Sequence, residues 1–132
     1  MRQKEILKEF IESTNNLIKL SEHITISISD IKKDIECFKK FGISLLGKPI
    51  ITIFNDFVQL YYLILSHHDN CLIYQDLIED DFDLDHQFQI QLEGMILITE
   101  EFHNEYHSLK ERFTRFHFDV SQSDILSKVQ VG

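Results

Sequence analysis

The first forty residues carry hydrophobic or small side chains at alternating steps of three and four positions. This spacing is typical of a helix that turns one face toward a core. The stripe extends without a break to the glycine at position 42, a residue type that often ends a helix in the left-handed conformation. The stripe consists of Leu7, Phe10, Thr14, Leu17, Ser21, Ile24, Ile28, Ile31, Ile35 and Phe38.

Residues 24–28 give a competing signal inside this stripe. Isoleucine alternates there with threonine and serine, and such β-branched alternation is typical of a strand. We therefore predict two helices rather than one, over residues 2–22 and 29–41, with Ser27 or Ser29 as the N-cap of the second.

A third helix is predicted to start at Pro49, because proline suits the first turn of a helix, and to end near Ser66. Its apolar positions cover most of the circumference, which is typical of a helix at the centre of a bundle or in an oligomer seam. Residues 67–70 predict a turn, and Asp69 is placed to cap a short helix over residues 70–78. The apolar positions of the third helix are Ile50, Ile53, Phe54, Phe57, Val58, Leu60, Tyr61, Ile64 and Leu65.

The longest pattern lies near the C-terminus, where apolar positions follow a heptad over about thirty residues. It predicts one helix over residues 84–117, about 50 Å long at ~1.5 Å per residue. The architecture that follows is an all-α, mostly antiparallel bundle of four to five helices in one domain, residues 1–118, with a polar, partly frayed tail at 119–132. The heptad positions are Phe88, Leu92, Met95, Thr99, Phe102, Tyr106, Leu109, Phe113 and Phe116.

Charge is distributed very unevenly along the chain. Between Pro49 and Leu109 there is no lysine or arginine, but there are twelve aspartates and glutamates. Residues 1–48 hold 9 basic and 7 acidic side chains and residues 110–132 hold 4 and 3, so the net charge of −9 comes from the middle of the chain. A one-signed surface repels itself, and dipole effects explain acidic residues only in the first turn of a helix.

This asymmetry predicts a surface that faces a cationic partner. We expect a non-enzymatic, acidic protein-binding module, most concretely an inhibitor of the immunity or antitoxin kind that blocks a basic, nuclease-like protein. Charge complementarity suits that task because it accelerates association. The residues predicted to contact the partner are Asp76, Glu79, Asp80, Asp81, Asp83, Asp85, Glu93, Glu100 and Glu101.

Two patterns resemble metal-binding motifs, one made of aspartates and one made of a glutamate and two histidines. Asp81-x-Asp83-x-Asp85 starts like a calcium loop, but it lacks the glycine at position six and the glutamate at position twelve that the coordination needs. Glu100, His103 and His107 share one patch of the long helix, as metal ligands often do, yet the heptad places both histidines on the flank. We expect no metal and no cofactor, and keep a metal-binding bundle using these three residues as an alternative.

Other functions lack their sequence signals. There is no glycine-rich phosphate loop or G-x-S-x-G motif, so we expect no enzyme, and clustered basic residues for direct nucleic-acid binding are missing. The apolar run at residues 50–65 is interrupted by polar side chains and is too short to cross a bilayer, and we expect no secretory signal after Met1 because no apolar region follows it. Cys37 and Cys71 form no disulfide framework, so we expect reduced thiols in a cytoplasmic protein.

The long heptad helix bears on assembly as well. At about 50 Å it is longer than partners of ~16–20 residues, so its C-terminal half needs further cover. We predict a homodimer whose seam uses apolar heptad positions, with the acidic faces pointing away. The alternative function in this class is a self-associating scaffold protein.

Overall fold

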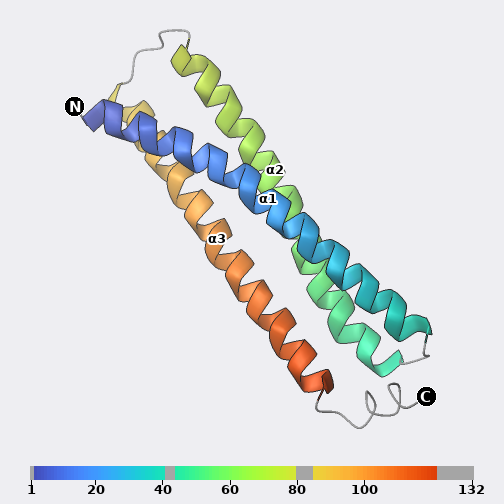
Figure 1. Ribbon diagram of the computed structural model, residues 1–132. Coiled ribbons are helices and arrows are strands. Elements are labelled where there is room, and N and C mark those ends of the chain that lie inside the picture. Colours follow the sequence, from blue (N-terminus) through green and yellow to red (C-terminus); the bar gives the residue numbers. More distant parts are fainter. Residues whose placement is uncertain (1, 41–43, 80–84, 122–132) are drawn as a thin grey trace.

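The described part of the protein consists of three long helices. The computed structural model describes residues 2–40, 44–79 and 85–121, and these contain α1 (Arg2–Lys40), α2 (Ser44–Glu79) and α3 (His86–Ser121). α1 and α3 run in the same direction and α2 runs antiparallel to both (Figure 1). Every pair of helices is in contact. The all-α bundle is thus confirmed, whereas the prediction of four to five helices is wrong, because two predicted breaks are helical.

The first predicted break lies inside α1. The side chains of Ser21 and Thr25 donate hydrogen bonds to backbone carbonyls one turn earlier, at 2.7 and 2.9 Å, so their hydroxyls are satisfied within the helix. Ile24 and Ile31 are fully buried and continue the stripe across the strand-like run. The predicted caps at Ser27 and Ser29 are wrong, since burial on one face outweighs the local β preference.

The second predicted break lies inside α2. This helix begins five residues before Pro49, so the proline lies within the second turn, where its missing N–H removes one backbone hydrogen bond. The predicted turn at residues 67–70 is helical as well, and Asp69 is an exposed residue of α2 rather than a cap. The reason is that His67 and Cys71 are both buried, which carries the three–four spacing across the polar stretch.

With that continuation, α2 has a heptad stripe as long as those of its neighbours. All its members are buried or half-buried, and their spacing alternates between three and four. The stripe consists of Ile50, Ile53, Phe57, Leu60, Ile64, His67, Cys71, Tyr74 and Ile78.

α3 confirms the heptad predicted for it. All nine predicted positions, from Phe88 to Phe116, are buried or half-buried. Asp85 caps the helix, since its carboxylate accepts a hydrogen bond from the backbone N–H of Phe88 at 2.8 Å. The helix continues to Ser121, and residues 122–132, most of the predicted tail, lie outside the described residues.

The core runs along the whole axis of the bundle. α1 has 39 residues and α2 and α3 have 36 each, which corresponds to about 54–58 Å for every helix. The expectation that α3 outreaches its neighbours is therefore wrong, and its heptad is covered within one chain. The homodimer stays a prediction, but the argument that α3 needs a second copy to cover its C-terminal half no longer holds.

Candidate functional site

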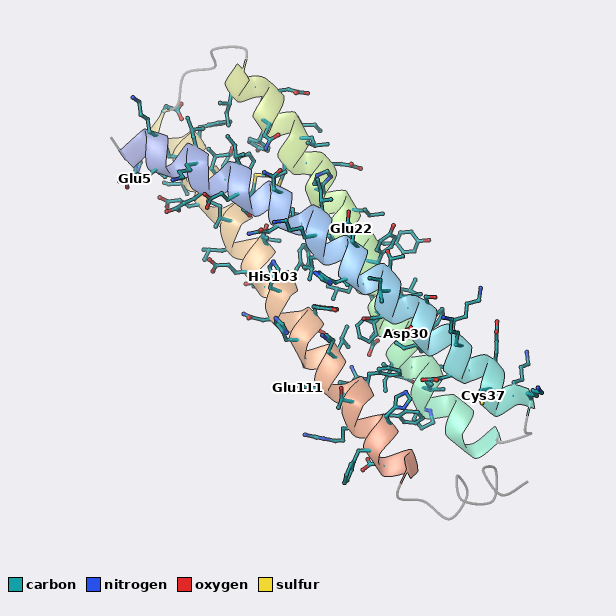
Figure 2. The ribbon with its side chains drawn as sticks, in the orientation of Figure 1. Glu5, Glu22, Asp30, Cys37, His103 and Glu111 are labelled. Carbon is teal, nitrogen blue, oxygen red and sulfur yellow. The ribbon has the colours of Figure 1, made fainter. Side chains whose placement is uncertain are left out.

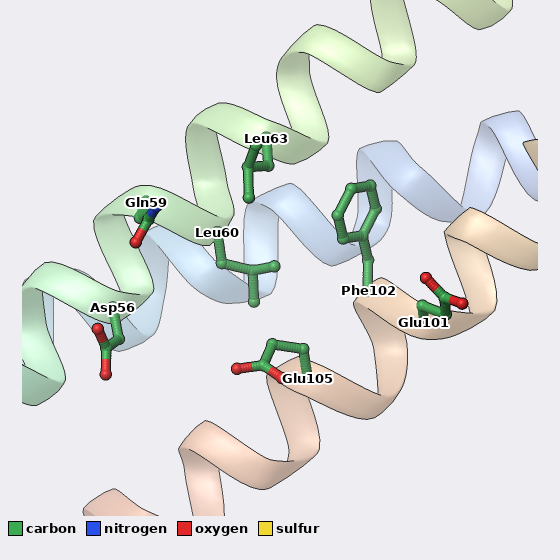
Figure 3. A pocket seen from close by; sticks show the side chains of 7 residues that line it. All are labelled: Asp56, Gln59, Leu60, Leu63, Glu101, Phe102 and Glu105. Atoms are coloured by element: carbon green, nitrogen blue, oxygen red, sulfur yellow. The ribbon is translucent and has the colours of Figure 1, made fainter.

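A groove of about 430 Å³ lies between α2 and α3. Its floor is apolar, and in Figure 3 Leu60 and Phe102 lie between the two helices, with α1 behind them. Leu63 is half-exposed at its edge. The full lining consists of Asp56, Gln59, Leu60, Leu63, Glu101, Phe102 and Glu105.

A second groove, of about 330 Å³, lies on the other side of α3, against α1. Its lining is mostly polar, and His103 and Ile96 are its half-buried α3 members. The full lining consists of Glu9, Glu12, Ser13, Asn16, Ile96, Thr99, Glu100 and His103.

The two grooves share a one-signed charge. Three carboxylates line each groove, and neither lining includes a lysine or an arginine. Glu100 and Glu101 are neighbours in the chain, yet the first lines the groove with α1 and the second the groove with α2. Arg112 lies at the end of the α2–α3 groove and donates to Asp56 at 2.8 Å. No described residue forms an ion pair or hydrogen bond with Glu101 or Glu105.

The structure brings together only part of the predicted partner surface. Glu100 and Glu101 lie in the grooves, while Asp76 is exposed on α2. Asp85 caps α3, and Glu93 is half-buried. The side chain of Glu79 and all of Asp80, Asp81 and Asp83 lie outside what the structure describes.

Four groove carboxylates were missed by the sequence reasoning. Asp56 and Glu105 belong to the one-signed segment but were not selected, although the heptad of α3 places Glu105 beside its apolar stripe. Glu9 and Glu12 lie in an N-terminal segment of balanced charge. Only the packing of α1 against α3 brings these two glutamates to the groove.

Histidines gather beside the α1–α3 groove. His103 is half-buried, and its pKa lies below the usual 6.5 because of burial first and then of nearby His107 and His23. Figure 2 shows His103 on α3. Within residues 2–40, 44–79 and 85–121, no group of three or more histidine, cysteine or acidic side chains is placed to hold a metal ion.

A layer of buried polar side chains crosses the core in the half of the bundle where α2 leads to α3. The Nε2 atom of His67 lies 3.1 Å from the carbonyl of Met95 and 3.4 Å from the hydroxyl of Thr99. Because a carbonyl oxygen only accepts, Nε2 carries the proton of the neutral ring and donates to Met95. Burial lowers the pKa of His67, and the hydrogen bond to Met95 offsets part of that shift.

Cys71 belongs to the same layer. Its sulfur lies 3.7 Å from Nε2 of His67, and Thr14 of α1 hydrogen-bonds to the thiol. Burial raises the pKa of Cys71, which keeps the thiol protonated and unreactive near neutral pH. Cys37, in contrast, is exposed near the end of α1.

α2 contains a long apolar stretch. By length and composition Pro49–Ile78 could cross a bilayer: an 18-residue window within it has a mean hydropathy of 1.3, and 28% of that window is buried. A core helix of a bundle passes the same test. The prediction that the apolar run at residues 50–65 cannot cross a bilayer relied on its length and on its polar interruptions; the length argument no longer holds, because α2 continues to Glu79.

Comparison with known proteins adds no family to this description. The chain matches no protein-family model, and neither the curated proteins nor the solved structures gave a match. The functional argument therefore starts from the two grooves and their charge.

Proposed function

We propose that this protein is a non-enzymatic binding module for a basic protein, of the immunity or antitoxin kind, that blocks its partner through the carboxylates along α3. The observation that carries this proposal is the pair of grooves flanking α3, lined by six carboxylates and by no lysine or arginine. Two adjacent residues, Glu100 and Glu101, connect the two grooves into one acidic surface.

The placement of these carboxylates suits a binding surface. They project from three long helices whose backbones are held by a continuous core, so little order has to be gained when a partner binds. A cluster of like charges repels itself in the free protein, and a cationic partner relieves that repulsion. Charge complementarity also raises the association rate, which an inhibitor of a harmful partner requires.

Two alternatives lose their original support. The scaffold hypothesis relied on heptads free to self-associate, and those heptads are buried within one chain. The metal-binding bundle relied on Glu100, His103 and His107, and no metal-binding group exists among the described residues. The cytoplasmic location and the absence of membrane and nucleic-acid partners stay predictions.

Affinity capture from the source cells followed by mass spectrometry tests the proposal. The groove variant replaces Glu9, Glu12, Glu100, Glu101 and Glu105 with Gln. A matched control replaces five exposed acids outside the grooves, Glu5, Glu22, Asp30, Glu36 and Asp69, with the corresponding amides; the first three project from α1 in Figure 2. We expect a basic partner that wild type and control retain and the groove variant loses. Equal retention by both variants would contradict the proposal.

A further inference from the structure

The α2–α3 groove extends beyond its deepest part along both helices. Asp56 and Arg112 are paired across it, and seven residues further along α2 and back along α3, Leu63 and Glu105 again line it together. Nearer the far end, the hydroxyl of Tyr74 donates a hydrogen bond to the side chain of Gln91 at 3.1 Å, and Nε2 of His67 lies 3.4 Å from the hydroxyl of Thr99. In this antiparallel arrangement residue 67 of α2 lies opposite residues 98–99 of α3.

Exposed apolar side chains alternate between the two helices along this line. Leu63 is 50% exposed, Ile98 of α3 is 40% exposed and Leu77 of α2 is 37% exposed. Because Ile98 lies opposite residue 67, the three side chains occur about four and ten residues apart along α2, or ~6 and ~15 Å along the groove. An amphipathic helix has apolar side chains three or four residues apart along one face, and these intervals fit that spacing. The line therefore matches the apolar face of one further helix.

Gly94 adds a second feature on the same side of the groove. It lies one heptad before Glu101, and a Cβ atom added to it meets nothing within 4 Å. Glycine in a helix interior costs about 0.5–1 kcal/mol relative to alanine, and no packing within the chain compensates for this cost. The missing side chain leaves room at the rim for another backbone to approach.

Charge defines the other property of the occupant. Glu101 and Glu105 line the rim without partners among the described residues, and no lysine or arginine occurs between Pro49 and Leu109. A second copy of this chain also carries a net charge of −9, so a cationic occupant complements the rim better.

We propose that the α2–α3 groove binds a basic amphipathic helix of the partner protein, which completes a four-helix bundle. This proposal rests on the proposed function and names the docking element and its place. The apolar stripe of the bound helix packs on Leu63, Ile98 and Leu77, and its lysines or arginines face Glu101 and Glu105. An interaxial distance of ~8–10 Å, typical of packed helices, is reached most easily at Gly94.

A labelled peptide of about eighteen residues, ~27 Å long as a helix, serves as the probe in fluorescence anisotropy. It carries leucines at three–four spacing and lysines elsewhere, and its control has the same composition with the leucines scattered. We expect wild type to bind the amphipathic peptide at least about tenfold more tightly than the scattered one, because only the former buries a continuous stripe.

Matched variants locate the binding site. Leu63→Ser and the pair Glu101→Gln with Glu105→Gln should each weaken binding at least about fivefold. Leu72→Ser is the control for leucine, because Leu72 is also exposed and lies nine residues, half a circumference, from Leu63. The pair Glu5→Gln with Glu22→Gln is the control for charge, because both residues are exposed on α1 and line neither groove. Gly94→Leu fills the rim without disturbing the core and should also weaken binding.

Three outcomes would overturn the docking proposal. Equal weakening by the two glutamate pairs would mean that charge alone governs binding. The proposed function would then stand, but docking of a helix in the α2–α3 groove would be excluded. Equal binding of the two peptides would exclude an amphipathic helix as the occupant. Self-association that Leu63→Ser abolishes, seen by light scattering, would assign the groove to a second copy. Failure of the proposed function is recognised separately: the captured partner would then bind the groove variant of the affinity-capture experiment as well as it binds wild type.

Discussion

The two halves of the bundle differ in what they bury. In one half, where α1 and α2 are linked, the described buried residues are apolar or aromatic, such as Ile31, Phe57 and Leu109. In the other half, where α2 leads to α3, lie all four of the buried polar residues that the structure describes: Ser13, Thr14, His67 and Thr99. Both halves use the same heptad geometry, so the difference lies in chemistry rather than in backbone shape.

Apolar burial and buried hydrogen bonds have different effects: the first stabilises the bundle, and the second fixes how the helices are aligned along their axes. Apolar layers contribute stability through burial but accept several alignments, whereas a hydrogen bond such as that from His67 to Met95 forms in only one. A shift of α2 along α3 by one heptad would leave the ring of His67 buried without its acceptor, at a cost of about 1–3 kcal/mol. We infer that the polar layer aligns the helices, while the apolar side chains buried in both halves supply most of the packing energy between them.

The largest expected effect comes from truncating the apolar half. Phe57 is fully buried and packs edge-on against Tyr106, so Phe57→Ala should lower the free energy of unfolding by about 3–5 kcal/mol. The loss should be the same at pH 7.5 and pH 5.5. Denaturant unfolding followed by circular dichroism measures it, with the exposed Tyr62→Ala as control. A loss below about 1 kcal/mol would contradict the packing described.

The pH dependence of stability should come from the polar half. The pKa of His67 is below its ordinary value of 6.5 in the folded protein, so the unfolded chain binds more protons as the pH falls. Its contribution to stability is present above pH 6.5 and is lost as the pH falls from there through the folded pKa. His103 acts in the same direction.

His67→Leu should therefore flatten the fall in stability between pH 7.5 and 5, and His103→Gln should remove a further part. Melting temperatures across this range measure the slope. His86→Gln is the control, because His86 is exposed at the start of α3. An unchanged slope in the His67 variant would show that the polar layer does not control acid stability.

Substitution of Gly94 tests the packing on the outer surface of the polar half. Because its Cβ position is open and it lies inside α3, Gly94→Ala should stabilise the protein by about 0.5–1 kcal/mol. Thermal unfolding measures this gain. A loss of stability would mean that the position is crowded, which would also remove the argument for a helix approaching there.

The smallest expected effect concerns the ion pair between Asp56 and Arg112. Their side chains are 39% and 46% exposed, so Asp56→Asn should cost only about 0.2–1 kcal/mol. The cost should shrink at high salt, because exposed pairs are screened. Unfolding at low and at molar salt measures the difference, with Asp69→Asn as control. A large, salt-independent loss would place this pair in the core rather than at the groove edge.

The sequence by itself determined which faces of α1 and α3 turn inward, but not which face of α2 does so. The stripe of α1 and the heptad of α3 were predicted residue by residue, because burial imposes a period on the sequence that needs no knowledge of the neighbours. It also indicated where charge of one sign accumulates, since that depends on composition alone. Among the acids of the segment without lysine or arginine, those at residues 80, 81 and 83 and the side chain at 79 lie outside the described residues.

Tertiary structure decided what local signals left ambiguous. The strand-like run at residues 24–28 and the polar stretch at 67–70 became helical because a neighbouring helix offers burial to Ile24, His67 and Cys71. The grooves were decided in the same way, since Glu9 of α1 and Glu100 of α3 are ninety-one residues apart in the chain and meet only through packing. Local propensity is worth a few tenths of a kcal/mol per residue, and burying one large side chain is worth several times more.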